Sequence, residues 1–116
     1  MNQGSVISLS SINADFQVRV DRRPDLSETL LASDFLQLSG GKAANVAYLA
    51  HKLGLPAILI AHVGADTLAE QALKPLQEIE VDLKYVHAIK GKPTGVSMIT
   101  VPPRWQKGNY FSWKCK

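Results

Sequence analysis

The chain has 116 residues, enough for one small domain with its own core but too few for a two-lobed enzyme. Its composition, 46% hydrophobic and 20% charged, is typical of a soluble globular protein, and no apolar run is long enough to span a membrane. The net charge of +3 resides in a tail after residue 102, which holds four of the 13 basic residues and no acidic one, so nucleic-acid binding by the body is not indicated.

The cysteine content and the N-terminal sequence bear on the cellular compartment. Cys115 is the single cysteine, so an internal disulfide framework is excluded. Residues 1–4 lack the basic and apolar segments of a secretory signal. We therefore expect a cytoplasmic protein that neither spans nor binds a membrane.

Extended segments dominate the first forty residues. Residues 5–10 are rich in β-branched side chains and are predicted to form a first strand, which ends in the polar cluster of residues 11–15. Residues 16–20 alternate apolar and polar side chains, as does the stretch of residues 30–38. A turn at residues 22–25 separates them, so these two strands are predicted to form a small sheet beside the first strand.

A helix and a buried strand follow. The helix is predicted from Lys42 to about Leu53, where Gly54 and Pro56 end it. Its apolar side chains recur at helical spacing and are expected to be buried: Ala43, Val46, Ala47, Ala50 and Leu53. Residues 57–63 form a nearly continuous apolar run, which is typical of a parallel strand covered on both faces.

The next helix is predicted from Thr67 to about Ile79. Asp66 is expected to cap it, Thr67 and Glu70 have the spacing of a capping box, and Pro75 should kink or shorten it. Strands at residues 85–89 and 94–101 complete an alternation of strands and helices. This order predicts an α/β domain with right-handed crossovers.

Two consecutive glycines mark the most promising site. Gly40 and Gly41 end an extended stretch and allow a tight turn with close backbone approach to a ligand. The helix that Lys42 opens offers unpaired N–H groups, which favour an anion or a hydroxylated ligand, and Asn45 lies one turn into it. A simple turn before a helix remains the alternative, and the pattern is neither a P-loop nor a G-x-G-x-x-G fingerprint.

Four segments, taken in order, resemble the N-terminal part of ribokinase-like (PfkB-type) carbohydrate kinases, and ribokinases are the subgroup that they resemble most. They are residues 11–15 (SINAD), 40–45 (GGKAAN), 63–66 (VGAD) and 94–99 (TGVSMI). The resemblance implies an α/β fold, a partial Rossmann-like sheet with helices plus a small β-sheet lid. It also implies a lid that closes over a ribose-like sugar and in the family often forms a homodimer contact.

The resemblance assigns substrate-binding roles to residues of this chain. Asp15 would accept hydrogen bonds from sugar hydroxyls, and Asn13 would bind the same ring. Gly40 and Gly41 would let the backbone approach the sugar, while Lys42 and Asn45 would add polar contacts. The family transfers phosphate from ATP to a sugar hydroxyl with Mg²⁺.

The resemblance also implies what the chain lacks. The family's catalytic base, nucleotide-binding residues and anion hole belong to a C-terminal half that this sequence does not contain. No catalytic, cofactor-binding or metal-binding residue is therefore expected here, and the chain alone is expected to bind no ATP or Mg²⁺ productively and to be inactive. A non-catalytic sugar-binding or lid-dimerisation module is the alternative.

The remaining features favour structural rather than chemical interpretations. Residues 1–102 are predicted to form the kinase-like part. Residues 103–116 are predicted to be a tail without family resemblance, read out of frame or disordered, although its basic and aromatic side chains leave nucleic-acid binding as an alternative. His51, His62 and His87 do not share the spacing of metal ligands, so each is predicted to be an ordinary surface or core histidine.

Overall fold

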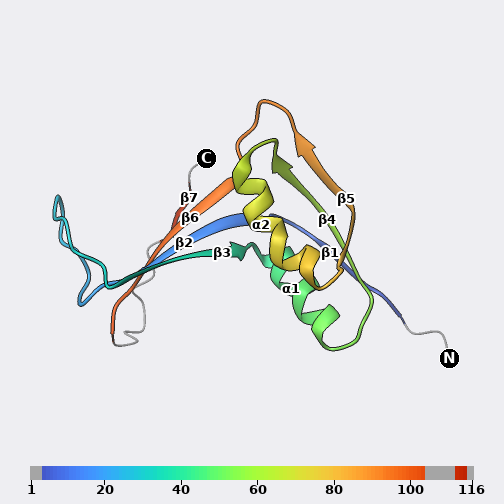
Figure 1. Cartoon of the computed structure of the whole chain (residues 1–116), viewed down its shortest axis with the longest axis horizontal. Coiled ribbons are helices and arrows are strands. Elements are labelled where there is room, and N and C mark those ends of the chain that lie inside the picture. Colours follow the sequence, from blue (N-terminus) through green and yellow to red (C-terminus); the bar gives the residue numbers. More distant parts are fainter. Residues whose placement is uncertain (1–3, 104–111, 115–116) are drawn as a thin grey trace.

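The structure, a computed structural model, describes residues 4–103 and the short strand at residues 112–114. The chain forms two β-sheets and two helices in an elongated molecule of 54 × 35 × 22 Å (Figure 1). One sheet forms the body with both helices, and the other projects from it as a lid. The α/β architecture with a β lid is therefore confirmed.

The body sheet is parallel and has three strands in the order β1-β4-β5. They are β1 (Val6–Leu9), β4 (Ala57–Gly64) and β5 (Asp82–Ile89). Helices α1 (Lys42–Lys52) and α2 (Thr67–Glu78) connect successive strands, as parallel pairing requires. Both helices contribute to one hydrophobic core with the same face of β4, centred on Leu59.

The lid sheet has four strands in the order β3-β2-β6-β7. They are β2 (Asn13–Arg19), β3 (Asp34–Gly40), β6 (Gly95–Val101) and β7 (Ser112–Lys114). Strand β2 lies in the middle, antiparallel to β3 and parallel to β6. Because only three residues separate β1 from β2, the first strand of the body leads almost directly into the lid (Figure 1).

Helix α1 packs closely on the sheet because its buried side is made of alanines. Ala43, Ala44, Ala47 and Ala50 are buried, and small side chains allow the helix backbone to approach β1 and β4. Val46 and Leu53, expected in the buried stripe, are instead 50% and 70% exposed. The prediction for these two residues was wrong because they lie to one side of the alanine stripe, where no described element covers them.

Strand β4 is covered on one face only, contrary to the expectation of burial on both. Its alternating residues Ala57, Leu59, Ala61 and Val63 are buried under the helices, whereas Ile60 and His62 are exposed. Ile7 and Leu9 on β1 lie in register with Ile58 and Ile60 and are 65% and 73% exposed. No element among the described residues packs on this second face, which we call the bare face.

The structure confirms Asp66 as the cap of helix α2, but it contradicts the capping box and the shortening expected at Pro75. The Asp66 side chain caps it by accepting a hydrogen bond from the Ala69 backbone N–H at 2.9 Å, so a capping box begun by Thr67 is not formed. The helix also continues through Pro75 to Glu78. The proline is tolerated because it removes a single intrahelical bond, while the buried Leu76 beyond it holds the last turn in the core.

Three residues of the tail, which was predicted to be read out of frame or disordered, form a strand. Ser112–Lys114 form β7, which pairs antiparallel with the outer edge of β6, from Ser97 opposite Lys114 to Ile99 opposite Ser112. An edge strand such as β6 presents unpaired backbone groups, so an extended segment can add to it. The rest of the tail after residue 103, including Cys115, lies outside the described residues, and its predicted character remains a prediction.

Candidate functional site

The paired glycines meet the end of β1 as the sequence suggested. In the lid sheet Asn13 is in register with Gly40, and Asp15 with Leu38. A Cβ atom at Gly40 would overlap the Asp15 carboxylate, and one at Gly41 would overlap the Ser11 carbonyl oxygen. The absence of side chains is therefore what allows the bend to lie against residues 11–15, and Asp15 and the two glycines share one site.

Asn13 and Asp15 are nevertheless placed on a different element from the one expected. The sequence suggested a polar cluster following the first strand, with the lid strand beginning at residue 16. The structure includes both residues in β2, as the inner end of the lid. The extended backbone puts both side chains on the same face of the sheet, because they are two residues apart.

Asp15 has an unusual electrostatic environment. The side chain as a whole is half-buried, but its Oδ1 atom is inaccessible to solvent and has no hydrogen-bond partner in the described structure. Burial raises the pKa of the carboxyl group, and a hydrogen bond with Ser97 opposes that rise. A buried acceptor without a donor is costly, so a ligand hydroxyl that donates to it would relieve the cost.

Ser97 is a site residue that the sequence analysis missed. It is buried, and it is the register partner of Asp15 on the neighbouring strand β6. Next to it, Gly95 is the partner of Asn13, and a Cβ atom there would lie 2.6 Å from the Asn13 Oδ1 atom. The alternation in residues 94–101 puts Gly95 and Ser97 on one face, but only the strand register reveals which residues they face.

Lys42 and Asn45 lie at the start of α1, directly after the glycine bend. Gly41 has a φ of 100° and occupies the N-cap position without a side chain to cap the helix, and the first turn contains no acidic residue. The side chains of Lys42 and Asn45 are exposed, and in the described structure neither makes a hydrogen bond to Asn13 or Asp15. They remain candidates by position next to the site.

The start of α1 is fixed to the body sheet. The buried Ser8 hydroxyl on β1 donates a hydrogen bond of 2.9 Å to the Ala43 carbonyl oxygen. This contact holds the first turn of α1, with its open N–H groups, at the end of β1. The helix N-terminus and the Asp15 carboxylate are thus both positioned by residues that flank the glycine bend.

A second hydrogen-bond network ties the lid to the body. Asp66 accepts hydrogen bonds from the Thr94 backbone N–H at 2.8 Å and from the Thr94 hydroxyl at 2.6 Å. The Gly64 backbone N–H donates to the Thr94 hydroxyl at 2.9 Å. The hydrogen bonds from Thr94 lower the pKa of Asp66. Because Thr94 immediately precedes β6, this network positions the strand that carries Ser97.

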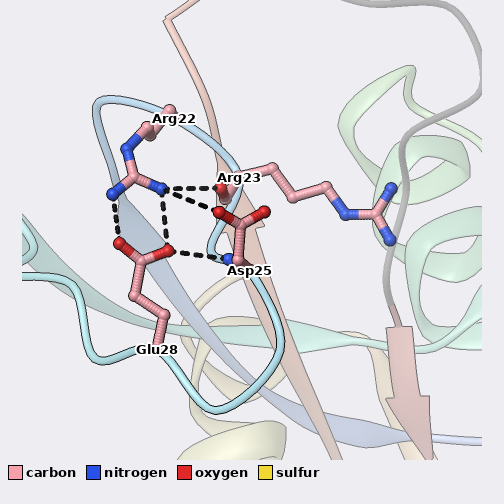
Figure 2. A network of polar contacts seen from close by, with 4 residues as sticks. All are labelled: Arg22, Arg23, Asp25 and Glu28. Atoms are coloured by element: carbon pink, nitrogen blue, oxygen red, sulfur yellow. Dashed lines mark hydrogen bonds and ion pairs between the residues drawn. The ribbon is translucent and has the colours of Figure 1, made fainter.

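The loop between β2 and β3 lies at the opposite, outer end of the lid. Figure 2 shows its ion pairs, in which the Arg22 guanidinium binds the Glu28 carboxylate with two nitrogens, one of them 2.8 Å from Oε2. The Asp25 backbone N–H also donates to Glu28 at 2.8 Å. The hydrogen bonds from Arg22 lower the pKa of Glu28 to about 2. These contacts shape the loop and do not reach Asp15.

An open cavity of about 510 Å³ lies at the same outer end and is lined in part by Gln17, Arg19, Ser33 and Val101. None of the predicted site residues lines it. No group of three or more histidine, cysteine, aspartate or glutamate side chains that could hold a metal ion occurs among residues 4–103. No described helix is long and apolar enough to cross a membrane.

The inner end of the lid therefore combines a carboxylate, an amide, a hydroxyl and an approachable backbone. Such groups recognise a hydroxylated ligand, because together they accept and donate several hydrogen bonds in fixed directions. The chemistry that these groups offer is the binding and orientation of such a ligand.

The sequence matches the family described as pfkB family carbohydrate kinase over residues 3–111. This segment extends beyond residue 102, where the sequence pattern suggested that the resemblance ends. Among curated proteins, the ribokinase of Lactococcus lactis is 33% identical over 102 residues, which cover 87% of this chain and 33% of that protein. An ATP-dependent ribose-1-phosphate kinase of Halopiger xanaduensis is 34% identical over 96 residues, covering 83% of this chain and 32% of that protein.

Solved structures agree with the sequence matches. The structure of Arabidopsis thaliana ribokinase complexed with ribose and ATP superimposes with a TM-score of 0.78 at 27% identity, covering 98% of this chain and 36% of that one. The chain spans about a quarter to a third of the length of curated relatives that it matches, from 25% to 33%.

Proposed function

Because the chain belongs to the pfkB family of carbohydrate kinases, we propose that it forms the sugar-binding part of an ATP-dependent sugar kinase with ribokinase-like specificity. The observation that carries this proposal is the buried, unpartnered Oδ1 atom of Asp15 beside the Gly40–Gly41 bend. A buried carboxylate oxygen that needs a donor, on the face of a lid, suits the hydroxyl of a sugar.

The residues around Asp15 receive complementary roles in this proposal. Asn13 and Ser97 flank Asp15 on the lid and bind neighbouring hydroxyls of the same ring. Gly40 and Gly41 keep the bend free of side chains, so that the sugar can contact the backbone. Lys42 and Asn45 reach the ligand from the first turn of α1, whose open N–H groups also favour polar oxygen atoms.

ATP and Mg²⁺ belong to the activity of the complete kinase in this proposal. When bound, they supply the phosphoryl group and the charge neutralisation that its transfer requires. Residues 4–103 contain no group of three or more side chains that could hold a metal ion. We assign the nucleotide site and the catalytic base to protein outside this chain, and we derive no catalytic step from its residues.

The first test is activity. In a coupled assay of ADP release with ribose, fructose or adenosine, the chain alone is expected to give no turnover above the blank. The assay uses an intact ribokinase as its positive control. Clear turnover by the chain would overturn the assignment of the catalytic groups to protein outside it.

The second test is binding. Isothermal titration calorimetry with D-ribose is expected to detect binding that Asp15→Asn weakens roughly tenfold or more, because a hydrogen bond to a charged group contributes about 1.5–3 kcal/mol. Asp34→Asn is the matched control: Asp34 lies on the same face of the lid, at its outer end, where it pairs with Arg19. Equal losses in both variants would argue against a site at Asp15.

A lid-mediated homodimer is a second proposal, and it is compatible with the first. Leu36 and Leu38 are register partners of Gln17 and Asp15, so they lie on the ligand-facing side of the lid. They are 37% and 42% exposed. A second lid packed across this side would cover them and enclose the sugar site.

A further inference from the structure

Two histidines that are far apart in the sequence lie side by side on the bare face of the body sheet. His62 on β4 is in direct register with His87 on β5, so both side chains project from the same face. Both residues are exposed. Their ring centroids are 6.3 Å apart, and the ring planes are inclined at 45°. The sequence separation hides this pairing, which depends entirely on the β4–β5 register.

The ring separation is within reach of a shared metal ion. A Zn–N bond of about 2.0–2.1 Å puts a metal roughly 3.2 Å from the centroid of each imidazole, so the centroids of two rings on one ion lie at most about 6.4 Å apart. A tetrahedral angle at the ion brings them to roughly 5.2 Å. The closure of about 1 Å requires only a rotation of two exposed side chains about χ1 and χ2.

The surroundings leave space over the two rings. Along the strands, the next pair on one side is Ile60 with Tyr85, and on the other side Gly64 with Ile89. On the Gly64 side the backbone of residues 92–94 lies where a side chain would be, but no described helix or strand covers the two exposed rings. Because no third histidine, cysteine or carboxylate among the described residues completes a cluster, water would fill the other coordination positions.

We propose that His62 and His87 form a two-histidine site for a divalent late first-row transition ion, such as Zn²⁺ or Cu²⁺. Neutral imidazole nitrogen is a preferred ligand of these ions and a poor ligand of Mg²⁺. The ion joins β4 to β5 across the sheet. It therefore stabilises the folded chain, by an amount that grows with the logarithm of its free concentration above the Kd, because the unfolded chain does not hold the two rings together.

The test is a titration of the full chain with ZnCl₂ by isothermal titration calorimetry. His62→Ala and His87→Ala are each expected to weaken Zn²⁺ binding roughly 100-fold, because the second imidazole binds intramolecularly. His51→Ala and Cys115→Ser are the matched controls, and both are expected to bind Zn²⁺ like the parent chain. MgCl₂ is expected to give no binding at the same site.

A second measurement does not depend on any variant. Electron paramagnetic resonance of the chain with one equivalent of Cu²⁺ is expected to show coupling to two imidazole nitrogens. Failure of the parent chain to bind Zn²⁺, unchanged binding in His62→Ala, or loss of binding in Cys115→Ser would each overturn the proposal. Coupling to a single nitrogen would overturn it as well.

Discussion

At the scale of single residues, Asp15 is a candidate binding group that lowers the stability of the folded chain. Its carboxylate lies against Gly40 and is held partly out of water, and the contribution of Ser97 opposes the rise in its pKa that burial causes. Burial raises the pKa of this carboxyl group, which means that folding disfavours its charged form relative to the unfolded chain. A ligand hydroxyl would supply the missing donor.

The first prediction concerns the pH dependence of stability. The pKa of Asp15 is higher in the folded than in the unfolded chain. The resulting contribution of Asp15 to the free energy of unfolding is therefore fully present below the unfolded pKa of about 3.9, and it is lost as the pH rises through the folded pKa. Asp15→Asn should therefore unfold at a higher temperature than the parent at pH 7, and the difference should shrink toward pH 4. The measurement is thermal unfolding followed by circular dichroism.

The exposed Asp21→Asn variant is the control. The difference between its unfolding temperature and that of the parent should not shrink in this way from pH 7 to pH 4. A parent chain that is more stable than Asp15→Asn at pH 7 would contradict the prediction. The same variant is expected to bind ribose more weakly, so stability and binding should change in opposite directions.

The second prediction concerns the glycine bend. Gly41 combines a φ of 100° with a backbone neighbour where a Cβ atom would lie, so Gly41→Ala is expected to lower the free energy of unfolding by at least about 2 kcal/mol. Gly54 has a φ of 79° but open space around it, so Gly54→Ala should cost only about 1 kcal/mol. Urea unfolding measures both, and equal losses would show that close approach at Gly41 is unimportant.

At the scale of elements, the lid depends on contacts made at its base. Thr94 lies before β6 and is 3% exposed, and its hydroxyl bridges the Gly64 N–H and the Asp66 carboxylate. On the other side of the lid, the Ser39 hydroxyl of β3 donates to the Ala72 carbonyl oxygen of α2 at 2.5 Å. These contacts attach the two strands that flank β2 to the body.

The third prediction tests this attachment. Thr94→Val keeps the shape of the side chain but leaves the Gly64 N–H without an acceptor, so it should lower the free energy of unfolding by about 1–3 kcal/mol. Thr100→Val on the same strand should change it by less than about 0.5 kcal/mol. Hydrogen exchange should show faster exchange in β6 for Thr94→Val, and equal exchange in both variants would exclude a role for the network.

Most helices and strands could be predicted, because the signals for each lie within its own segment of the sequence. Alternation identified the lid strands, and the apolar run of residues 57–63 identified β4. The glycine bend and the Asp66 cap were also visible, because both depend on neighbours in sequence. Ser97 and the His62–His87 pair were not, because each depends on a strand register that forms between distant segments.

At the scale of the whole molecule, the helices cover only one side of the body sheet. The bare face exposes Ile7, Leu9, Ile60 and Tyr85, and a parallel sheet is usually covered on both faces. The lid extends away from this body (Figure 1), and helix α2 packs on one side of it at its inner end, where Ala14 is buried. An exposed apolar surface of this kind favours association.

The fourth prediction is that the chain self-associates. Size-exclusion chromatography at micromolar concentration should show species larger than a monomer. Leu9→Glu combined with Ile60→Glu should reduce them if the bare face associates, whereas Leu36→Glu with Leu38→Glu should do so if the lid does. Leu26→Glu, at a residue 99% exposed in the outer loop, is the control. A compact monomer of the parent chain would contradict the prediction.

A sugar bound between Asp15 and the glycine bend is tested most directly by titrating the ¹⁵N-labelled chain with D-ribose and following the titration by NMR. Saturable shifts are expected at the backbone amides of Asn13, Asp15, Gly40, Gly41 and Ser97, and Asp15→Asn should need roughly tenfold more ribose or more to reach the same shifts. Shifts confined to other parts of the chain, or equal shifts in the parent and the variant, would contradict it.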